Sequence, residues 1–461
     1  RGVSSGTLAW ALATAALLSL HTAAAVSAKA LPTGAISLTA GAVSLTAGAV
    51  SLTAGAISLE VQLPAGVPLA GYGGFPRRAW LPDFLGRFPN TFWFNPSSGV
   101  HDPLRVRALA LESGGLRVVW LSVDLVAVDP AMVAEVRALL ADRGGEPPIL
   151  IVSASHTHSG PGAYADSGFW ALVAADRKSP AVRRVILDGM EKAAREALRR
   201  RAPALLAWGK TTVTGVAISR LDQPLDPELG LLKVMGADGR PVALVWNYAV
   251  HGTALGRANS LLSGDLMADA SARLERETGA PVLFVNGAAG DVSPRQRGWP
   301  GVESAGAALA SAALAAWRTL PPGRDLTLSA VRSQVSLPGP ALSVRNCTGR
   351  WVPAAFRLGL GWTLPSSAGL TAVRIGGTAW VTVPGELQTR LGLDIKTAGR
   401  RTFEETFVAG YSNDYLGYFL TRRDYGQPSY IACGSFYGES GGGIVRAAAV
   451  RSRSPAARDR G

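Results

Sequence analysis

The sequence predicts an α/β fold, in which mixed β-sheets flanked by helices form a single large catalytic domain. From about Gly71 onward, apolar runs typical of strands alternate with segments of helical periodicity. In addition, 48% of the 461 residues are hydrophobic and 17% are charged, so the chain can bury a large core. The length would also allow two or three domains, but one large unit accounts for the pattern equally well.

The first succession of strand, helix and strand covers residues 116–154. LRVVWLSVDLVAV (116–128) is typical of a buried strand. PAMVAEVRALLADRGG (130–145) begins with proline and ends in two glycines, as helices commonly do. PPILIVSA (147–154) is predicted to be the next strand.

The following part of the chain repeats this alternation. Apolar and small residues at helical spacing predict an amphipathic helix over 181–201. VALVWNYAV (242–250) and PVLFVNGAAG (281–290) are predicted strands on either side of a helix over 265–278.

Residues 1–28 have the pattern of a signal peptide. Arg1 precedes an apolar segment from Leu8 to Leu20, and Val26-Ser27-Ala28 offers small residues for cleavage. This segment is too short to span a bilayer, and no later stretch is long and apolar enough, so we expect no transmembrane span in the mature chain. The expected location is secreted, periplasmic or at the cell surface. The sequence carries no indication of oligomeric state.

A seven-residue unit, SLTAGAV, recurs between Ser37 and Leu59. Glycine and β-branched residues in each unit disfavour a coiled coil. We therefore interpret 29–58 as a repeat-containing linker or first strand, of which only the last copy pairs into a sheet. The catalytic domain is expected to occupy 59–446, and the arginine-, serine- and alanine-rich tail, 447–461, to be disordered.

The formal net charge of +13 raises the question of nucleic-acid binding. The basic residues are scattered and lack interleaved aromatics, and the main cluster, Arg199 to Arg201, ends a predicted helix, where cations offset the helix dipole. We therefore expect no nucleic-acid partner, whereas attraction to an anionic membrane surface stays open. Cys347 and Cys433 form either one disulfide or two unpaired core thiols.

Three histidines at strand ends are the main candidates for chemistry. His156 and His158 follow the run ILIVSA, and His251 follows WNYAV. Residues i and i+2 of a strand share a face, so His156 and His158 are expected to point the same way. Strand ends of open α/β sheets converge, which makes a site shared with His251 plausible. From these motifs alone, a metal site and ordinary core or surface histidines are about equally supported.

Several motifs occur in a fixed order along the chain. They are SHTHSGPG (155–162), WNYAVHGTAL (246–255) followed by SGD (263–265), GAAGDVSP (287–294) and VPGEL (383–387). Together they resemble the ordered motifs of the neutral/alkaline non-lysosomal ceramidase family, from about Gly71 to Tyr437. The resemblance implies a zinc amidase that hydrolyses the N-acyl amide bond of ceramide, or of a related N-acyl lipid, through metal-activated water.

The resemblance also implies a set of zinc ligands. The family has a ligand tyrosine twelve residues before a second active-site tyrosine, and Tyr418 and Tyr430 match this spacing. Tyr415 and Tyr425 fit it less well and remain reserve candidates. The implied ligands are His156, His251, Glu386 and Tyr418.

A second set of residues is implied to act on the substrate. His158 becomes a neighbour of the metal rather than a ligand. Arg220 lies in AISRLD, and Ser293 in GDVSP either attacks the substrate or binds one of its hydroxyl groups. The arginine, Tyr430 and His158 could hold the developing oxyanion or protonate the leaving amine. The implied catalytic residues are His158, Arg220, Ser293 and Tyr430.

Some features differ from the ceramide-cleaving members of this family. Those proteins carry an immunoglobulin-like domain after the catalytic one, and we expect no such domain in the sequence that follows Tyr437 here. LAGYGGF (69–75) and the short 220–251 segment also differ. The alternatives are therefore a zinc hydrolase of a different amide or ester, and a non-catalytic lipid- or surface-binding protein on the same fold.

Four further features have simpler interpretations. Asp265 is expected to cap the helix that follows it, and Asp291 either to orient a ligand histidine or to close a turn. Asp124 is either a support for the site or a satisfied polar group at a strand end. GYGG (71–74) lacks the Lys-Ser/Thr of a phosphate loop and is predicted to be a tight turn that lines the site.

Overall fold

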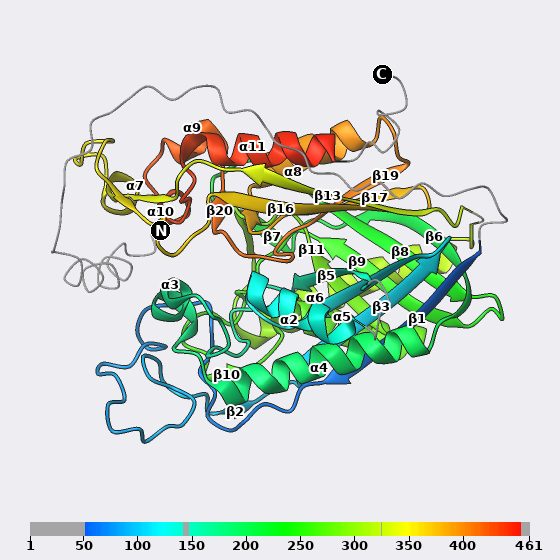
Figure 1. The fold of residues 1–461 in the computed structure, drawn as a ribbon, viewed down its shortest axis with the longest axis horizontal. Helices are drawn as coiled ribbons and strands as arrows, with labels where there is room; N and C mark the ends of the chain where they lie inside the picture. The colour runs from blue at the N-terminus through cyan, green and yellow to red at the C-terminus, as the bar shows by residue number, and fades with distance from the viewer. Residues whose placement is uncertain (1–50, 142–146, 324, 453–461) are drawn as a thin grey trace.

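The computed structural model describes residues 51–141, 147–323 and 325–452 (Figure 1). Its strands are β1 (Leu52–Glu60), β2 (Gly99–Val100), β3 (Arg105–Ser113), β4 (Leu116–Val123), β5 (Ile149–Ala154), β6 (Ala202–Thr212), β7 (Ala217–Ser219), β8 (Glu228–Gly236), β9 (Pro241–Tyr248), β10 (Leu261–Leu262), β11 (Val282–Asn286), β12 (Val292–Pro294), β13 (Leu328–Ser336), β14 (Ala341–Ser343), β15 (Arg357–Gly359), β16 (Ser367–Ile375), β17 (Thr378–Thr382), β18 (Glu386–Leu387), β19 (Glu405–Ala409) and β20 (Tyr418–Phe419).

Its helices are α2 (Pro130–Leu140), α3 (Gly168–Trp170), the π-helical turn η1 (Ala171–Ala175), α4 (Pro180–Arg199), α5 (Asp265–Thr278), α6 (Gly298–Thr319), α7 (Val344–Thr348), α8 (Thr389–Gly399), α9 (Arg422–Tyr425), α10 (Tyr430–Cys433) and α11 (Gly438–Arg451). Within the described ranges, no helix combines the length and the hydropathy needed to cross a membrane. The predicted signal peptide, 1–28, lies outside the described residues.

The elements form four layers (Figure 1). An eight-stranded mixed sheet has the order β11-β9-β8-β6-β1-β3-β4-β5, and a smaller sheet has the order β13-β16-β17-β19. One face of the large sheet packs against α2, α4, α5 and α6, and its other face packs against the smaller sheet. Helices α8 and α11 cover the far face of the smaller sheet. This arrangement confirms the predicted fold class of mixed sheets flanked by helices.

The strands of the large sheet are apolar on both faces because both faces are covered. In β3, Val106 and Ala108 pack against the helical layer, whereas Leu109 and Leu111 face the smaller sheet. Such strands read as continuous hydrophobic runs rather than as alternating ones. Both predicted β-α-β successions are confirmed, since β4 pairs in parallel with β5 and β9 pairs in parallel with β11.

The sequence prediction placed both ends of the catalytic domain differently from the structure. β1 begins at Leu52 in the third copy of the repeat and pairs with β3 over its full length, so the expectation that only the last copy pairs is wrong and the predicted boundary after residue 58 falls inside a strand. At the other end, α11 continues to Arg451, so the prediction of disorder from 447 is wrong for 447–451. Alanine favours a helical conformation, and Ala448 and Ala449 of α11 are buried in the hydrophobic core between this helix and the smaller sheet.

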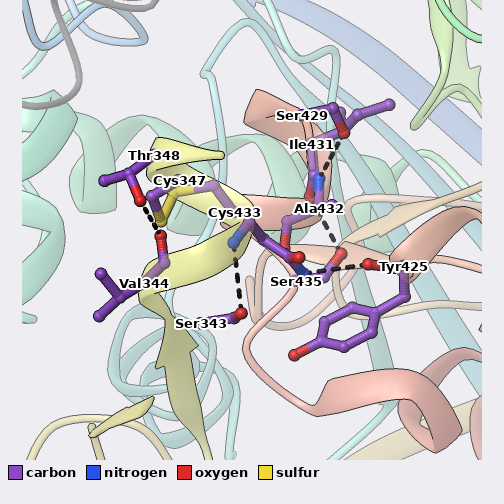
Figure 2. The surroundings of a disulfide bond; sticks show 11 residues. Ser343, Val344, Cys347, Thr348, Tyr425, Ser429, Ile431, Ala432, Cys433 and Ser435 are labelled. Carbon is purple, nitrogen blue, oxygen red and sulfur yellow. Dashed lines mark hydrogen bonds between the residues drawn. A yellow bond between two sulfur atoms is a disulfide. The ribbon is translucent and has the colours of Figure 1, made fainter. Parts of the chain in front are cut away.

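Cys347 and Cys433 form a disulfide that joins α7 to α10 (Figure 2). The two cysteines are separated by 86 positions, and closing such a loop typically stabilises a protein by about 2–4 kcal/mol. The side-chain amide of Asn346 adds a second link, because it donates hydrogen bonds to the carbonyls of Tyr425 at 3.0 Å and Ala432 at 3.4 Å. Helix α10, which begins at Tyr430, is thereby fixed to α7.

Candidate functional site

The ends of several strands meet at one place in the fold. The large sheet curls, so that its end strands β11 and β5 approach each other although they are the two edges of the sheet. His156 follows β5 and His251 follows β9, while Glu386 begins β18 beside the smaller sheet. The shared site that the sequence predicted therefore depends on this curvature.

Asn286, the last residue of β11, fixes the distance between the two segments that carry these histidines. Its fully buried side-chain amide donates hydrogen bonds to the carbonyl of Ser155 at 3.1 Å and to that of Val250 at 2.8 Å. Each acceptor immediately precedes a histidine of the site. The sequence analysis missed Asn286, although its position at the end of a predicted strand was a signal that could have identified it.

His156 does not lie on a strand, in contrast to the prediction. β5 ends at Ala154, and His156 has a positive φ of 66°. Its Nδ1 donates to the carbonyl of Val126 at 2.6 Å, which leaves the lone pair of Nε2 directed at the site. The ring of Tyr411 stacks on the imidazole with 4.0 Å between the ring centroids. The orientation of His156 thus comes from a turn and two neighbours rather than from strand alternation.

We call His156, His251 and Glu386 the inner cluster. Nε2 of His251 lies 2.8 Å from Oε2 of Glu386, and Nε2 of His156 lies 3.6 Å from Oε1. All three side chains are at most 2% exposed. Burial lowers the pKa of His156 to about 3 and the pKa of His251 well below its ordinary value, so both imidazoles are neutral near pH 7.

The inner cluster fits a transition-metal ion. Nε2 of His251 and Oε2 of Glu386 are buried and have no hydrogen-bond partner of suitable geometry among the described residues. Leaving such atoms unsatisfied is costly, unless a ligand completes their coordination. Two neutral imidazoles and a carboxylate are a common donor set for catalytic zinc, and a ligand histidine typically donates its other N–H to a carbonyl, as His156 does.

His158 lies at the edge of the inner cluster and is partly exposed. Its Nε2 is 3.2 Å from Nε2 of His156, and one ring nitrogen from each of the three histidines lies within 4.8 Å of the other two. The ring of Tyr72 packs against it at 4.9 Å. Gly71 (φ 97°) is required there, since a Cβ atom would lie 2.6 Å from the imidazole. The predicted role of GYGG as a turn that lines the site agrees with this contact.

Three tyrosines approach Glu386. Tyr418 of β20 is the register partner of Glu386 in β18, so their side chains lie on the same face. Tyr415, a reserve candidate, donates a hydrogen bond to Oε1 of Glu386, and Tyr411 stacks on His156 as described above. Burial and the charge of Glu386 raise the pKa of all three hydroxyl groups. The sequence analysis missed Tyr411, which follows the end of β19.

We call Arg220, Ser293 and Tyr430 the outer group. Arg220 and Ser293 lie at the paired strands β7 and β12, and Nε of Arg220 donates to Oγ of Ser293 at 2.7 Å. Arg220 also donates to the hydroxyl of Tyr418 at 3.5 Å, and its guanidinium lies 5.6 Å from the ring centroid of Tyr430. Tyr430 is 51% exposed. The outer group therefore connects the inner cluster to the surface.

The structure brings together every residue that the sequence analysis singled out for the site. They are His156, His158, Arg220, His251, Ser293, Glu386, Tyr418 and Tyr430. Tyr425, the second reserve candidate, packs instead with Leu420 and Ala432. His101 is elsewhere and stacks on Trp299. The individual roles of these residues remain predictions.

The carboxylates near the site mostly have structural partners. Asp265 is not the helix cap that was predicted: Gly264 holds that position, and the Asp265 carboxylate accepts from the backbone N–H of Leu255 at 3.2 Å. This hydrogen bond holds the loop that follows His251. The backbone at Asp265 has a positive φ of 57°. Burial raises its pKa to about 6.

Asp291 and Asp124 also have partners of their own. Asp291 accepts from the backbone and side chain of Thr389, both at 2.7 Å, and so holds the start of α8 close to Glu386. Asp124 forms a buried ion pair with Arg107 at 3.2 Å. Of its two predicted interpretations, the satisfied polar group at a strand end agrees with this contact.

Comparison with known proteins finds similarity to neutral ceramidases. Residues 94–308 match the family model described as neutral/alkaline non-lysosomal ceramidase, N-terminal. The chain is 28% identical over 188 residues to a neutral ceramidase of Oryza sativa subsp. japonica, an alignment that covers 37% of this chain and 24% of the relative. It is 26% identical over 229 residues to the neutral ceramidase of Pseudomonas aeruginosa, covering 44% and 34%. The matched regions thus span about a quarter to a third of these relatives.

The fold extends the similarity beyond the aligned sequence. The crystal structure of neutral ceramidase from Pseudomonas aeruginosa superposes with a TM-score of 0.72 at 18% sequence identity, over 88% of this chain and 74% of that chain. Because the superposition covers 88% of this chain, it extends past the end of the family-model match at residue 308. The family match and the relatives agree that the chain is similar to the neutral/alkaline non-lysosomal ceramidase family, and the structural match shows that it shares the fold of a neutral ceramidase.

Proposed function

We propose that the protein is a zinc-dependent amidohydrolase that cleaves the N-acyl amide bond of ceramide or a related N-acyl lipid. The observation that carries the proposal is the inner cluster, in which two neutral imidazoles and a carboxylate converge with unsatisfied buried atoms. The match of residues 94–308 to the ceramidase family model supports the class of substrate. When bound, zinc supplies a Lewis acid that polarises the amide carbonyl and lowers the pKa of water.

The chain would hold the metal through side chains whose positions are already fixed. His156 and His251 would bind through Nε2, and Glu386 through its carboxylate. A tyrosine hydroxyl completes the set: the proposal takes Tyr418, and Tyr415 is the alternative because it already contacts Glu386.

The outer group would bind the reacting amide. Burial alone would lower the pKa of Arg220. Its electrostatic interactions with Tyr418, Tyr430 and Glu386 outweigh this effect and raise the pKa, so Arg220 stays positively charged. A fixed positive charge beside the metal ligands can stabilise the oxyanion that develops on the carbonyl. Because Oγ of Ser293 accepts from this arginine, its own proton remains free to donate to a polar group of the substrate.

His158 would move protons between water and the leaving amine. It is partly exposed, and its Nε2 lies 3.2 Å from Nε2 of His156 at the edge of the inner cluster. A neutral imidazole at this position can accept a proton from the attacking water and then donate one to the amine, which must leave protonated. Export to an oxidising compartment completes the proposal, supported by the signal-like residues 1–28 and by the Cys347–Cys433 disulfide.

The test is turnover of a fluorogenic short-chain ceramide by the purified protein. We expect activity that a chelator abolishes and that zinc, but not magnesium, restores. A parallel panel of an N-acyl amino acid and an O-acyl ester distinguishes a different amidase or esterase. Turnover that survives removal of all metal would contradict the metal mechanism. A zinc-loaded protein that hydrolyses none of these substrates would favour a non-catalytic lipid-binding role.

A further inference from the structure

Exposed aromatic and large aliphatic side chains are concentrated in two segments of the described chain. Fourteen large hydrophobic residues are exposed, and ten of them lie within residues 75–88 or 351–362. The first segment contains Phe75, Trp80, Leu81, Phe84, Leu85 and Phe88; the second contains Trp351, Phe356, Leu358 and Trp362. Five of these residues, Trp80, Leu81, Leu85, Trp351 and Trp362, are 78–86% exposed.

The two segments lie at the same end of the molecule, with α3 between them (Figure 1). Segment 75–88 continues the GYGG turn that contacts His158, and Arg78 donates hydrogen bonds to the carbonyls of Gly73 and Leu172. Phe169 and Trp170 of α3 belong to the same hydrophobic cluster as Val344 and Cys347, which precede segment 351–362. A continuous set of contacts therefore links both segments around α3.

The site opens at the same end. Trp170 packs on Tyr415 of the site at 4.7 Å, and the disulfide fixes the second segment to α10, which begins at Tyr430. Tyr430 is itself half exposed. Among the described residues of the outer group, Tyr430 is the exposed one, and its helix is linked by the disulfide to the element that precedes the second segment.

Most charged residues in and around these two segments are positively charged. Residues 71–98 contain three arginines and a single acidic residue, Asp83, and residues 344–364 contain three arginines and no acidic residue. The formal net charge of the two regions is therefore +2 and +3. In the first region Arg77 is buried and Arg87 is paired with Asp83, so the exposed positive charge is mainly that of the second region. In the second region, Arg350 and Arg357 are exposed beside Trp351 and Phe356. Tryptophan, phenylalanine and leucine next to arginine are the composition typical of surfaces that enter the headgroup region of a membrane.

We propose that residues 75–88 and 351–362 form one docking surface for an anionic lipid bilayer, with Tyr430 and the outer group facing the membrane. A bilayer would bury side chains that are otherwise more than three-quarters exposed, and anionic headgroups would attract the arginines. Both segments consist mainly of loops, so their side chains can enter the interface without disturbing the sheets. This binding does not depend on the proposed hydrolysis.

The experiment is co-sedimentation of the full chain with vesicles, without any substrate turnover. Vesicles of phosphatidylcholine alone are compared with vesicles that also contain phosphatidylglycerol. The test variants are Trp80→Ser with Leu81→Ser, and Trp351→Ser with Trp362→Ser. The control is Leu139→Ser, which removes a side chain that is 41% exposed on α2, outside both segments. Thermal melting checks that every variant is folded.

We expect tighter binding to the anionic vesicles, weakened by salt, and at least about a tenfold loss of binding in each double variant but not in the control. Equal binding by wild type and both double variants would overturn the proposal. So would self-association without vesicles that both double variants abolish, because the surface would then be a contact between two copies of the chain.

Discussion

The inner cluster and the outer group are adjacent, but the fold positions them by different means. His156, His251 and Glu386 are almost completely buried at the ends of strands, and Asn286 links the two segments that carry the histidines. In the outer group, Arg220 and Ser293 lie on a two-stranded ribbon, and Tyr430 is on a four-residue helix fixed by a disulfide. One region is rigid and closed, whereas the other reaches the surface.

This difference corresponds to two requirements of a metal hydrolase. A metal ion needs ligands at fixed distances, which strand ends within a packed core provide. A substrate has to enter and leave, and it therefore needs contacts near the surface. Changes in the inner cluster should consequently remove the metal, while changes in the outer group should lower the rate and leave the metal in place.

The largest effect is expected for Glu386→Gln. The substitution keeps the size of the side chain but removes the charge that balances a metal ion between two imidazoles. Metal content measured by mass spectrometry should fall to background, and turnover should fall on the order of 10³-fold, since a metal supplies several kcal/mol of transition-state stabilisation. Glu439→Gln, in an exposed carboxylate on α11, is the control. Undiminished metal content in Glu386→Gln would exclude this carboxylate as a ligand.

The two histidines of the H-x-H motif should respond differently. His156→Ala should lose the metal, because the Val126 carbonyl orients this imidazole for binding. His158→Ala should retain the metal and lose about 10²- to 10⁴-fold in rate, as expected for a proton-transfer residue. Parallel measurements of metal content and turnover check both. Equal metal loss would instead identify a site of three imidazoles, which the distances between the histidines allow.

Arg220→Gln tests the outer group directly. Loss of the guanidinium removes a fixed charge near the reacting carbonyl, so we expect a decrease in kcat of about 10²- to 10³-fold. The metal content should stay at the wild-type value. Arg240→Gln, at a position 88% exposed in its side chain, is the matched control. A parallel loss of metal in Arg220→Gln would mean that the two regions are not separable.

Asn286→Ala tests whether the inner cluster depends on the link between β5 and β9. The variant leaves the carbonyls of Ser155 and Val250 without their buried donor. We expect roughly 10- to 100-fold weaker metal binding, comparable with other losses of groups that orient ligands. Competition with a chromogenic chelator measures this affinity. Asn346→Ala, which removes a similar amide near the disulfide, should leave the metal affinity unchanged.

The smallest effect on the metal is expected for Cys347→Ser combined with Cys433→Ser. Unfolding measurements should show a loss of about 2–4 kcal/mol, because the disulfide no longer restricts the unfolded chain. Metal content should not change, since neither cysteine contacts the inner cluster. KM should rise because α10 holds Tyr430 less firmly. A normal KM in a destabilised variant would show that packing alone positions this tyrosine.

The sequence predicted the strands and helices that build the large sheet, since both β-α-β successions consist of long apolar runs with clear ends. It did not predict the curvature that brings β5 close to β11, because curvature depends on packing between residues far apart in sequence. The alternation of side chains along a strand predicted that His156 and His158 share one face. In the structure His156 has a left-handed backbone conformation, and its hydrogen bond to the Val126 carbonyl orients its ring.

The membership of the site was predicted more completely than its internal contacts. The ordered motifs led to five of the eight proposed residues, and the other three came from the AISRLD match and the spacing of the tyrosines. Tyr411 and Asn286 belong to no such match and act only through tertiary contacts. The twelve-residue spacing favoured Tyr418 over Tyr415, yet Tyr415 also bonds to Glu386. Side chains that meet only after folding leave little local pattern in a sequence.

The most direct test of the account is anomalous X-ray diffraction at the zinc edge from crystals of the zinc-treated protein. We predict one strong peak within about 2.0–2.2 Å of Nε2 of His156, Nε2 of His251 and a carboxylate oxygen of Glu386. The peak should also reveal whether Tyr418 or Tyr415 completes the ligands. No peak between these three side chains, in crystals soaked with saturating zinc, would contradict the metal centre on which the proposed function rests.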